Sequence, residues 1–194
     1  MKRRAFDLIA SIVGLGLAAI LFVAGGLLSW AHTFVGDQVH RQLSQQQIFF
    51  PPKGSEAIAA PEFAPMQKYA GQQLTTGDQA RVYADYFIGN HLKAIGGGKT
   101  YSQLSTQAQA NPDDAALAGK VETMFKGETL RGLLLNAYAF GKMGTIAGIA
   151  AISAYVGGGV MLVLGGLGLW HARRARDAEI FPEHDGQGRE LIQA

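Results

Sequence analysis

The uncharged segment LIASIVGLGLAAILFVAGGLLSWA, residues 8–31, decides the fold of this chain. It is longer than the roughly 20 apolar residues that a helix needs to cross a bilayer core. A second uncharged segment, MGTIAGIAAISAYVGGGVMLVLGGLGLW, covers residues 143–170 and is long enough to cross with some tilt. Both segments are too long for the core helix of a small soluble domain. We therefore predict two transmembrane helices, at residues 8–31 and 143–170.

The positions of the basic residues predict how these helices are oriented, because Lys and Arg beside a membrane helix are retained on the cytoplasmic side. The basic residues at the outer ends of the chain are Lys2, Arg3, Arg4, Arg173, Arg174 and Arg176. Only Arg41, Arg131 and Lys142 lie comparably close to the other two helix ends. We therefore expect residues 1–7 and the tail, residues 171–194, in the cytoplasm.

Ser29 and Ala31 also form the small-x-small pattern of a signal-peptide cleavage site. The apolar part of a signal peptide is usually about 7–15 residues long, however, and residues 8–31 are far longer. An uncleaved anchor is therefore favoured. This predicts a multi-pass protein of the cell membrane.

Small residues recur every four positions in both apolar segments. Burial of apolar surface does not drive helices together in lipid, so small residues matter because they let two backbones approach closely. We predict that these residues pack against protein rather than lipid, although Gly is also simply frequent in membrane helices. They are Ala10, Gly14, Ala18 and Gly26 in the first helix, and Gly144, Gly148, Ala150, Ala154, Gly158 and Gly166 in the second.

Residues 32–142 are long enough to fold around a modest core of their own. Polar N-cap residues predict helix starts at Thr75, Thr100 and Asn111, and the Pro51-Pro52 pair ends a helix that continues the first span. No long stretch alternates in the manner of a β-strand. We therefore predict an all-α membrane protein, in which an extracytoplasmic helical bundle domain lies between two transmembrane helices.

The composition offers little from which an active site could be built. A net charge of +2 without a basic cluster gives no nucleic-acid footprint. The absence of cysteine excludes disulfides, thiolate metal sites and cysteine nucleophiles. The string Gly96-Gly97-Gly98-Lys99-Thr100 has Lys93 where a phosphate-binding loop needs its first glycine. Neither a nucleic acid nor a nucleotide is therefore predicted as a partner.

Individual ionisable residues are also interpreted as structural rather than catalytic or metal-binding. His91 lies on the apolar face of its predicted helix and is interpreted as a core histidine rather than a metal ligand. Asp7 is interpreted as a structural charge at the positive end of the first helix rather than a proton relay. We predict no catalytic residue, no cofactor and no metal site.

One apolar feature of the central segment looks exposed. It consists of Phe49, Phe50, Pro51 and Pro52. These residues could contact a partner or the membrane surface. They could instead pack beneath the domain.

Three strings in the central segment resemble those of a group of small actinobacterial two-span membrane proteins of unknown function. They are Ile48-Phe49-Phe50-Pro51-Pro52, Tyr69-Ala70-Gly71-Gln72-Gln73-Leu74 and Gly127-Glu128-Thr129-Leu130-Arg131-Gly132-Leu133-Leu134-Leu135-Asn136-Ala137-Tyr138. The resemblance implies an actinobacterial cell envelope. Members of this group are sometimes labelled aromatic ring-opening dioxygenases, which need iron held by His and carboxylate ligands. No such set converges in this sequence, so the resemblance supplies no activity.

Features for packing are abundant in this chain and features for chemistry are sparse. The sequence therefore favours a non-enzymatic structural or accessory protein that associates with itself or with other subunits of an envelope complex. The alternative is an extracytoplasmic ligand-binding or sensing module. In that case Tyr83, Tyr86, Phe87 and His91 would line a pocket between helices.

Overall fold

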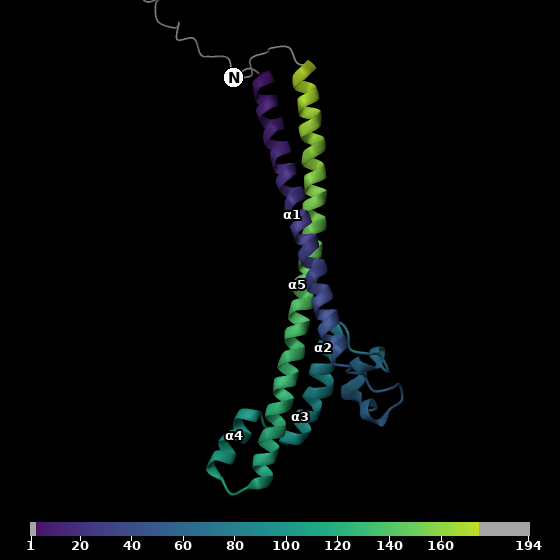
Figure 1. Cartoon of the computed structure of the whole chain (residues 1–194), viewed down its shortest axis with the longest axis vertical. Coiled ribbons are helices and arrows are strands. Elements are labelled where there is room, and N and C mark those ends of the chain that lie inside the picture. Colours follow the sequence, from purple (N-terminus) through teal and green to yellow (C-terminus); the bar gives the residue numbers. More distant parts are fainter. Residues whose placement is uncertain (1–2, 175–194) are drawn as a thin grey trace, which may run out of the picture. The chain divides into compact units, whose positions relative to one another are not determined.

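The computed structural model describes residues 3–174, which are mostly helical (Figure 1). Within this range no β-strand forms, and a single antiparallel bridge joins Phe49 to Gln73. The predicted all-α class is therefore confirmed for these residues. The elements in chain order are α1 (Arg3–Gln45), the 3-10 helices η1 (Glu56–Ile58) and η2 (Pro61–Tyr69), α2 (Gly77–Val82), the π-helix η3 (Tyr83–Ile88), α3 (Gly89–Gly96), α4 (Tyr101–Ala110) and α5 (Ala115–Arg174).

Two of these helices, α1 and α5, contain windows long and apolar enough to cross a membrane, as the two uncharged segments predicted. Only 17% of each window is buried inside the protein. A core helix of a soluble protein would be mostly buried. The apolar side chains of these windows therefore face outward along most of their length.

Helix starts follow their caps, with two corrections to the prediction. Thr100 caps α4 as predicted, with a reciprocal capping box to Gln103. The start predicted at Thr75 lies one residue later, at Thr76, because the Gln79 side chain reaches back to the Thr76 backbone N–H. The start predicted at Asn111 was also misplaced.

Asp114 rather than Asn111 is the residue that caps α5. The Leu117 N–H donates to Asp114 Oδ1 over 2.9 Å. The Asn111 N–H instead donates to the carbonyl of Ala108, and its side chain donates to the carbonyl of Gln107. Asn111 therefore belongs to the end of α4, and α5 begins after the following turn.

The described residues divide into two compact units. The first unit joins residues 3–29 of α1 to residues 149–174 of α5, and the second unit comprises residues 30–148. The units divide at residues 29/30 and 148/149, and the boundaries predicted at 31/32 and 142/143 stay predictions. Each unit has its own packing.

The first unit is an antiparallel helix pair (Figure 1). Most of its buried residues recur at a spacing of seven. A repeat of seven keeps one face of each helix toward its partner, as in left-handed coiled coils. Small side chains fill this seam and allow the backbones to approach, so that a Cβ atom added to Gly14 would lie 3.8 Å from the Met161 carbonyl oxygen. The buried residues of this unit are Ser11, Ala18 and Gly25 in α1, and Ala151, Gly158, Gly165 and Ala172 in α5, all at a spacing of seven, together with Ala154 between them.

The predicted four-residue stripes need correction, because a step of four advances about 40° around an α-helix. After several steps such a stripe has left the contact face. Ala10, Gly26 and Gly166 are accordingly exposed. The predicted residues that lie in or beside helix contacts are Gly14, Ala18, Ala154 and Gly158 in the first unit, and Gly144 and Gly148, which face Val35 and His32, in the second. Ala150 is half-buried.

The second unit has a core of apolar side chains drawn from all of its longer helices and from the segment that follows α1. Its largest fully buried members include Phe50, Leu43, Met66, Met124 and Leu134. Two backbone hydrogen bonds fix the segment after α1, from Phe50 N to Gln72 O and from Leu74 N to Ile48 O. They place the Phe50 ring inside.

Candidate functional site

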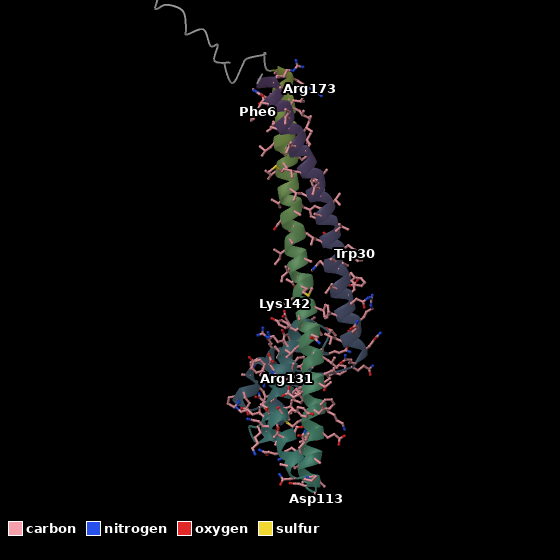
Figure 2. All side chains as sticks on the ribbon, turned by 90° about the vertical axis from the view of Figure 1, so that its left-hand side faces the viewer. Phe6, Trp30, Asp113, Arg131, Lys142 and Arg173 are labelled. Carbon is pink, nitrogen blue, oxygen red and sulfur yellow. The ribbon has the colours of Figure 1, made fainter. Side chains whose placement is uncertain are left out.

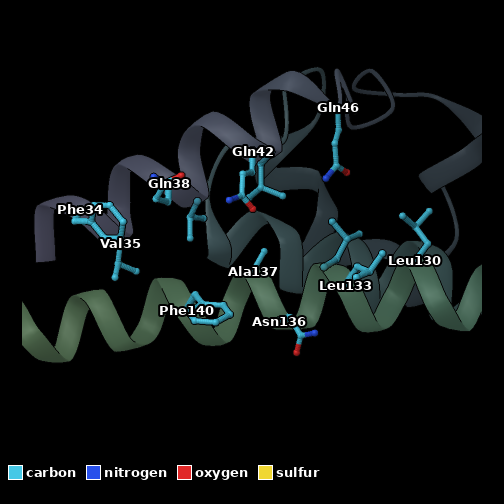
Figure 3. Close-up of a pocket in the computed structure, with 13 residues that line it drawn as sticks. Phe34, Val35, Gln38, Gln42, Gln46, Leu130, Leu133, Asn136, Ala137 and Phe140 are labelled. Atoms are coloured by element: carbon cyan, nitrogen blue, oxygen red, sulfur yellow. The ribbon is translucent and has the colours of Figure 1, made fainter. Parts of the chain in front are cut away.

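The candidate functional site is an apolar groove in the second unit, between the last turns of α1 and the part of α5 around residue 137 (Figure 3). Its volume is about 420 Å³, which is within the roughly 300–1,000 Å³ typical of small-molecule sites. Phe34 and Phe140 lie toward one end, and Leu130 and Leu133 toward the other. Ala137 leaves room between them because its side chain is small.

The polar lining of the groove consists of neutral amides. Gln38 and Gln42 are four residues apart on α1, which brings them to the same side of the helix, and Gln46 follows in the turn directly after α1. Asn136 comes from α5, and its amide points away from α1 (Figure 3). Within residues 3–174 none of these four side-chain amides is hydrogen-bonded to another protein group.

No ionisable side chain lines the groove along its described walls. A charged ligand would therefore find no counter-charge there. An uncharged apolar ligand would find a continuous apolar surface. The glutamine amides could donate hydrogen bonds to an ester or hydroxyl oxygen at its edge.

The pocket predicted from Tyr83, Tyr86, Phe87 and His91 does not coincide with this groove, which none of the four lines. Tyr83, Phe87 and His91 pack ring against ring, with centroid separations of 4.8 and 4.5 Å. Phe50 adds an edge-on contact to Tyr83 at 5.3 Å. Tyr83, Phe87 and His91 therefore contact one another rather than line the groove.

His91 itself was wrongly assigned to the core. It is exposed, and its Nδ1 lies 2.6 Å from the carbonyl oxygen of Phe87. The segment Tyr83–Ile88 is a π-helix, which shifts the register of the residues that follow it. A sequence reading that assumes 3.6 residues per turn throughout cannot anticipate this shift.

Burial raises the pKa of the Tyr83 phenol above its ordinary value of 10.0. The neutral phenol is thus favoured in the folded state, so its stabilising effect is complete below about pH 10 and is lost as the pH rises through the raised pKa. We expect the Tyr83→Phe variant to lose less stability than the wild type between about pH 8 and pH 11. Unfolding by denaturant at both pH values measures this. An identical loss in the two proteins would contradict it.

A cluster of charges ties α5 to the helices before it. Arg131 lies 3.3 Å from Asp85 and 3.4 Å from Glu128. Lys142 lies 2.9 Å from Asp78, and this hydrogen bond raises the pKa of the Lys142 ammonium group. All these groups are at least one-third exposed, so solvent screens each pair and its contribution to stability is small. These ion pairs link α5 to α2 and η3.

The first unit brings together two residues that the sequence did not connect. Asp7 Oδ2 lies 3.9 Å from His171 Nε2, and it accepts no hydrogen bond although it is buried. The Ser11 hydroxyl donates to the Asp7 backbone carbonyl over 2.6 Å. Among residues 3–174, no group of three His, Asp or Glu side chains is arranged to hold a metal ion. Two residues alone do not make a metal site.

The predicted partner-contact residues separate in the structure. Phe50 is only 2% exposed and belongs to the core, whereas Phe49 is 57% exposed. Pro51 is half-buried and Pro52 is exposed. The alternative of packing beneath the domain therefore holds for Phe50. Partner contact stays a prediction for Phe49 and Pro52.

Comparison of the chain with protein-family models, with curated proteins and with solved structures found no match. A function must therefore be argued from the geometry described above.

Proposed function

We propose that this chain is a two-span membrane protein whose residues 32–142 lie outside the cytoplasm. The observation that carries the proposal is the outward-facing apolar surface of α1 and α5, of which only 17% is buried in the most apolar windows. Such a surface is unfavourable in water, at about 25 cal/mol for each Å² exposed, and a bilayer would cover it. The arrangement of Lys and Arg at the chain ends supports cytoplasmic termini.

The seam of the first unit supports an uncleaved first helix over a signal peptide. Cleavage after Ala31 would remove the helix that packs against Ala151, Gly158 and Gly165. Those small residues would then lose their partner backbone. A seam of this kind has a use only if both helices stay in the mature protein.

The role we propose is that of a structural or accessory subunit, which associates with itself or with other subunits of an envelope complex. Within residues 3–174 the ionisable groups that meet are a four-residue charge cluster and simple pairs, all accounted for by packing or helix ends. Phe49 and a large outward apolar face remain available for contacts. Phe49 and this apolar face therefore support a role in association.

Intact cells treated with a membrane-impermeant, lysine-reactive crosslinker test both placement and association. Exposed lysines in the central segment, Lys53, Lys93, Lys99, Lys120 and Lys126, should crosslink to a second copy or to one recurring membrane protein. The linked peptides are identified by mass spectrometry, and a Lys126→Arg variant should lose only its own crosslinks. Reaction of these lysines only after lysis would contradict the placement. A chain that reacts in intact cells but links to nothing would contradict the association.

A further inference from the structure

We propose that the groove between α1 and α5 in the second unit holds one acyl chain of a membrane lipid. This inference goes beyond the proposed role and rests on the proposed membrane placement. Its first support is chemical. The walls are apolar, they carry no charge, and their polar groups at the α1 edge are the amides of Gln38, Gln42 and Gln46.

The second support is where the groove begins along the chain. Phe34 follows the end of the first predicted span by three residues, and Phe140 precedes the second span by three. Trp30 stacks on Phe34 with ring centroids 5.4 Å apart. Aromatic side chains of this kind concentrate at the headgroup level of a bilayer. The groove therefore starts within one helical turn of the level at which lipids end.

The third support is the length of the groove. Its wall on α1 runs from Phe34 to Gln46, which is about 18 Å at 1.5 Å per residue. Half of a bilayer core about 30 Å thick is roughly 15 Å, the depth that one extended acyl chain covers. The groove is thus long enough for one chain. Gln38, one turn beyond Phe34, could donate to an ester oxygen of the same lipid while its tail runs toward Leu133 and Leu130.

A second copy of the protein would fit this groove less well. The large side chains Phe34, Leu133 and Phe140 stand at the rim of the groove and would hold a helix of a second copy away from its floor at Ala137. These leave an elongated hollow suited to a narrow, flexible chain.

The test uses the full chain in nanodiscs of phosphatidylethanolamine and phosphatidylglycerol, doped with a phosphatidylcholine that carries a diazirine near the end of one tail. After illumination, labelled peptides are mapped by mass spectrometry. We expect label on Leu130 and Leu133 in addition to the two spans. In the Gln42→Trp variant the indole would fill the groove, and label at these two leucines should fall about tenfold.

Gln45→Trp is the matched control, because Gln45 is exposed on the same helix and does not line the groove. It should leave the label at Leu130 and Leu133 unchanged. Label on the spans but not on the groove would overturn the inference while leaving the membrane placement intact. Equal label in both variants, or crosslinked chains in place of lipid, would also overturn it. Absence of label from residues 8–31 and 143–170 would overturn the placement itself.

Discussion

Replacement of Gly77 by leucine should destabilise the second unit by about 2–3 kcal/mol, because it overpacks a contact between two backbones. Gly77 is the first residue of α2 and is buried against α5. A Cβ atom there would lie 3.1 Å from both the Ala137 carbonyl oxygen and the Tyr138 Cα. Neither atom belongs to a flexible side chain, so the helices themselves would have to move apart.

Gly141 shows that the contact is close from the other side as well. A Cβ atom on Gly141 would lie 3.4 Å from the Gly77 Cα. The two glycines thus face each other where α2 crosses α5. Lys142, the residue after Gly141, is labelled in Figure 2. Glycine at both positions permits a crossing that larger residues would widen.

The control for Gly77 is Gly132→Leu. Gly132 is exposed on α5, and nothing lies within 4 Å of the Cβ that it lacks. Leucine should raise helix stability there by a few tenths of a kcal/mol up to about 1 kcal/mol. Denaturation of the purified protein in mild detergent, followed by circular dichroism, compares the two. Equal stability of the Gly77 and Gly132 variants would contradict the backbone contact.

Features set by local sequence were predictable. The two apolar runs gave the long helices, since length without charge is a local property, and Thr100 with Gln103 gave the start of α4 through a capping box. Gly127 has a role that the local sequence does not show. It lies inside α5, and the missing side chain leaves room for Leu92 of α3.

The groove was not predictable, because the residues of each wall show no distinctive pattern in the sequence. Gln38, Gln42 and Gln46 look like a solvated helix face, and Leu130 and Leu133 look like ordinary core positions. Only the pairing of α1 with α5 brings them to opposite sides of one hollow. A pattern that depends on two segments about 90 residues apart is invisible to any reading of local periodicity.

In the first unit, most buried small residues of α1 and α5 recur at a spacing of seven, whereas the sequence suggested a spacing of four. Small residues do lie at the contact. At a spacing of four residues, however, the side-chain direction rotates by about 160° around the helix between Ala10 and Gly26. The seven-residue spacing of Ser11, Ala18 and Gly25 drifts by only about 20° per step. Residues next to each other in sequence can therefore differ completely in environment.

Substitutions at Gly165 and Gly166 test this difference in environment between neighbouring residues. A Cβ atom on Gly165 would lie 2.9 Å from Leu15 Cγ and 3.2 Å from the Ser11 carbonyl oxygen, whereas nothing lies within 4 Å of one on Gly166. Gly165→Leu should therefore separate the two helices by about 1–2 Å, toward the upper end of the usual 8–10 Å range of interaxial distances. Gly166→Leu should leave their separation unchanged.

Because the chain has no cysteine, spin labels can be placed uniquely at Ile20→Cys and Val156→Cys, two exposed positions in the first unit. Double electron–electron resonance in nanodiscs then reports the distance between the helices in each background. A shift with Gly165→Leu alone supports the seven-residue seam. A change in the distance with Gly166→Leu alone would instead support the contact predicted from the spacing of four residues. Equal distances in both variants would mean that close backbone approach does not hold this helix pair together.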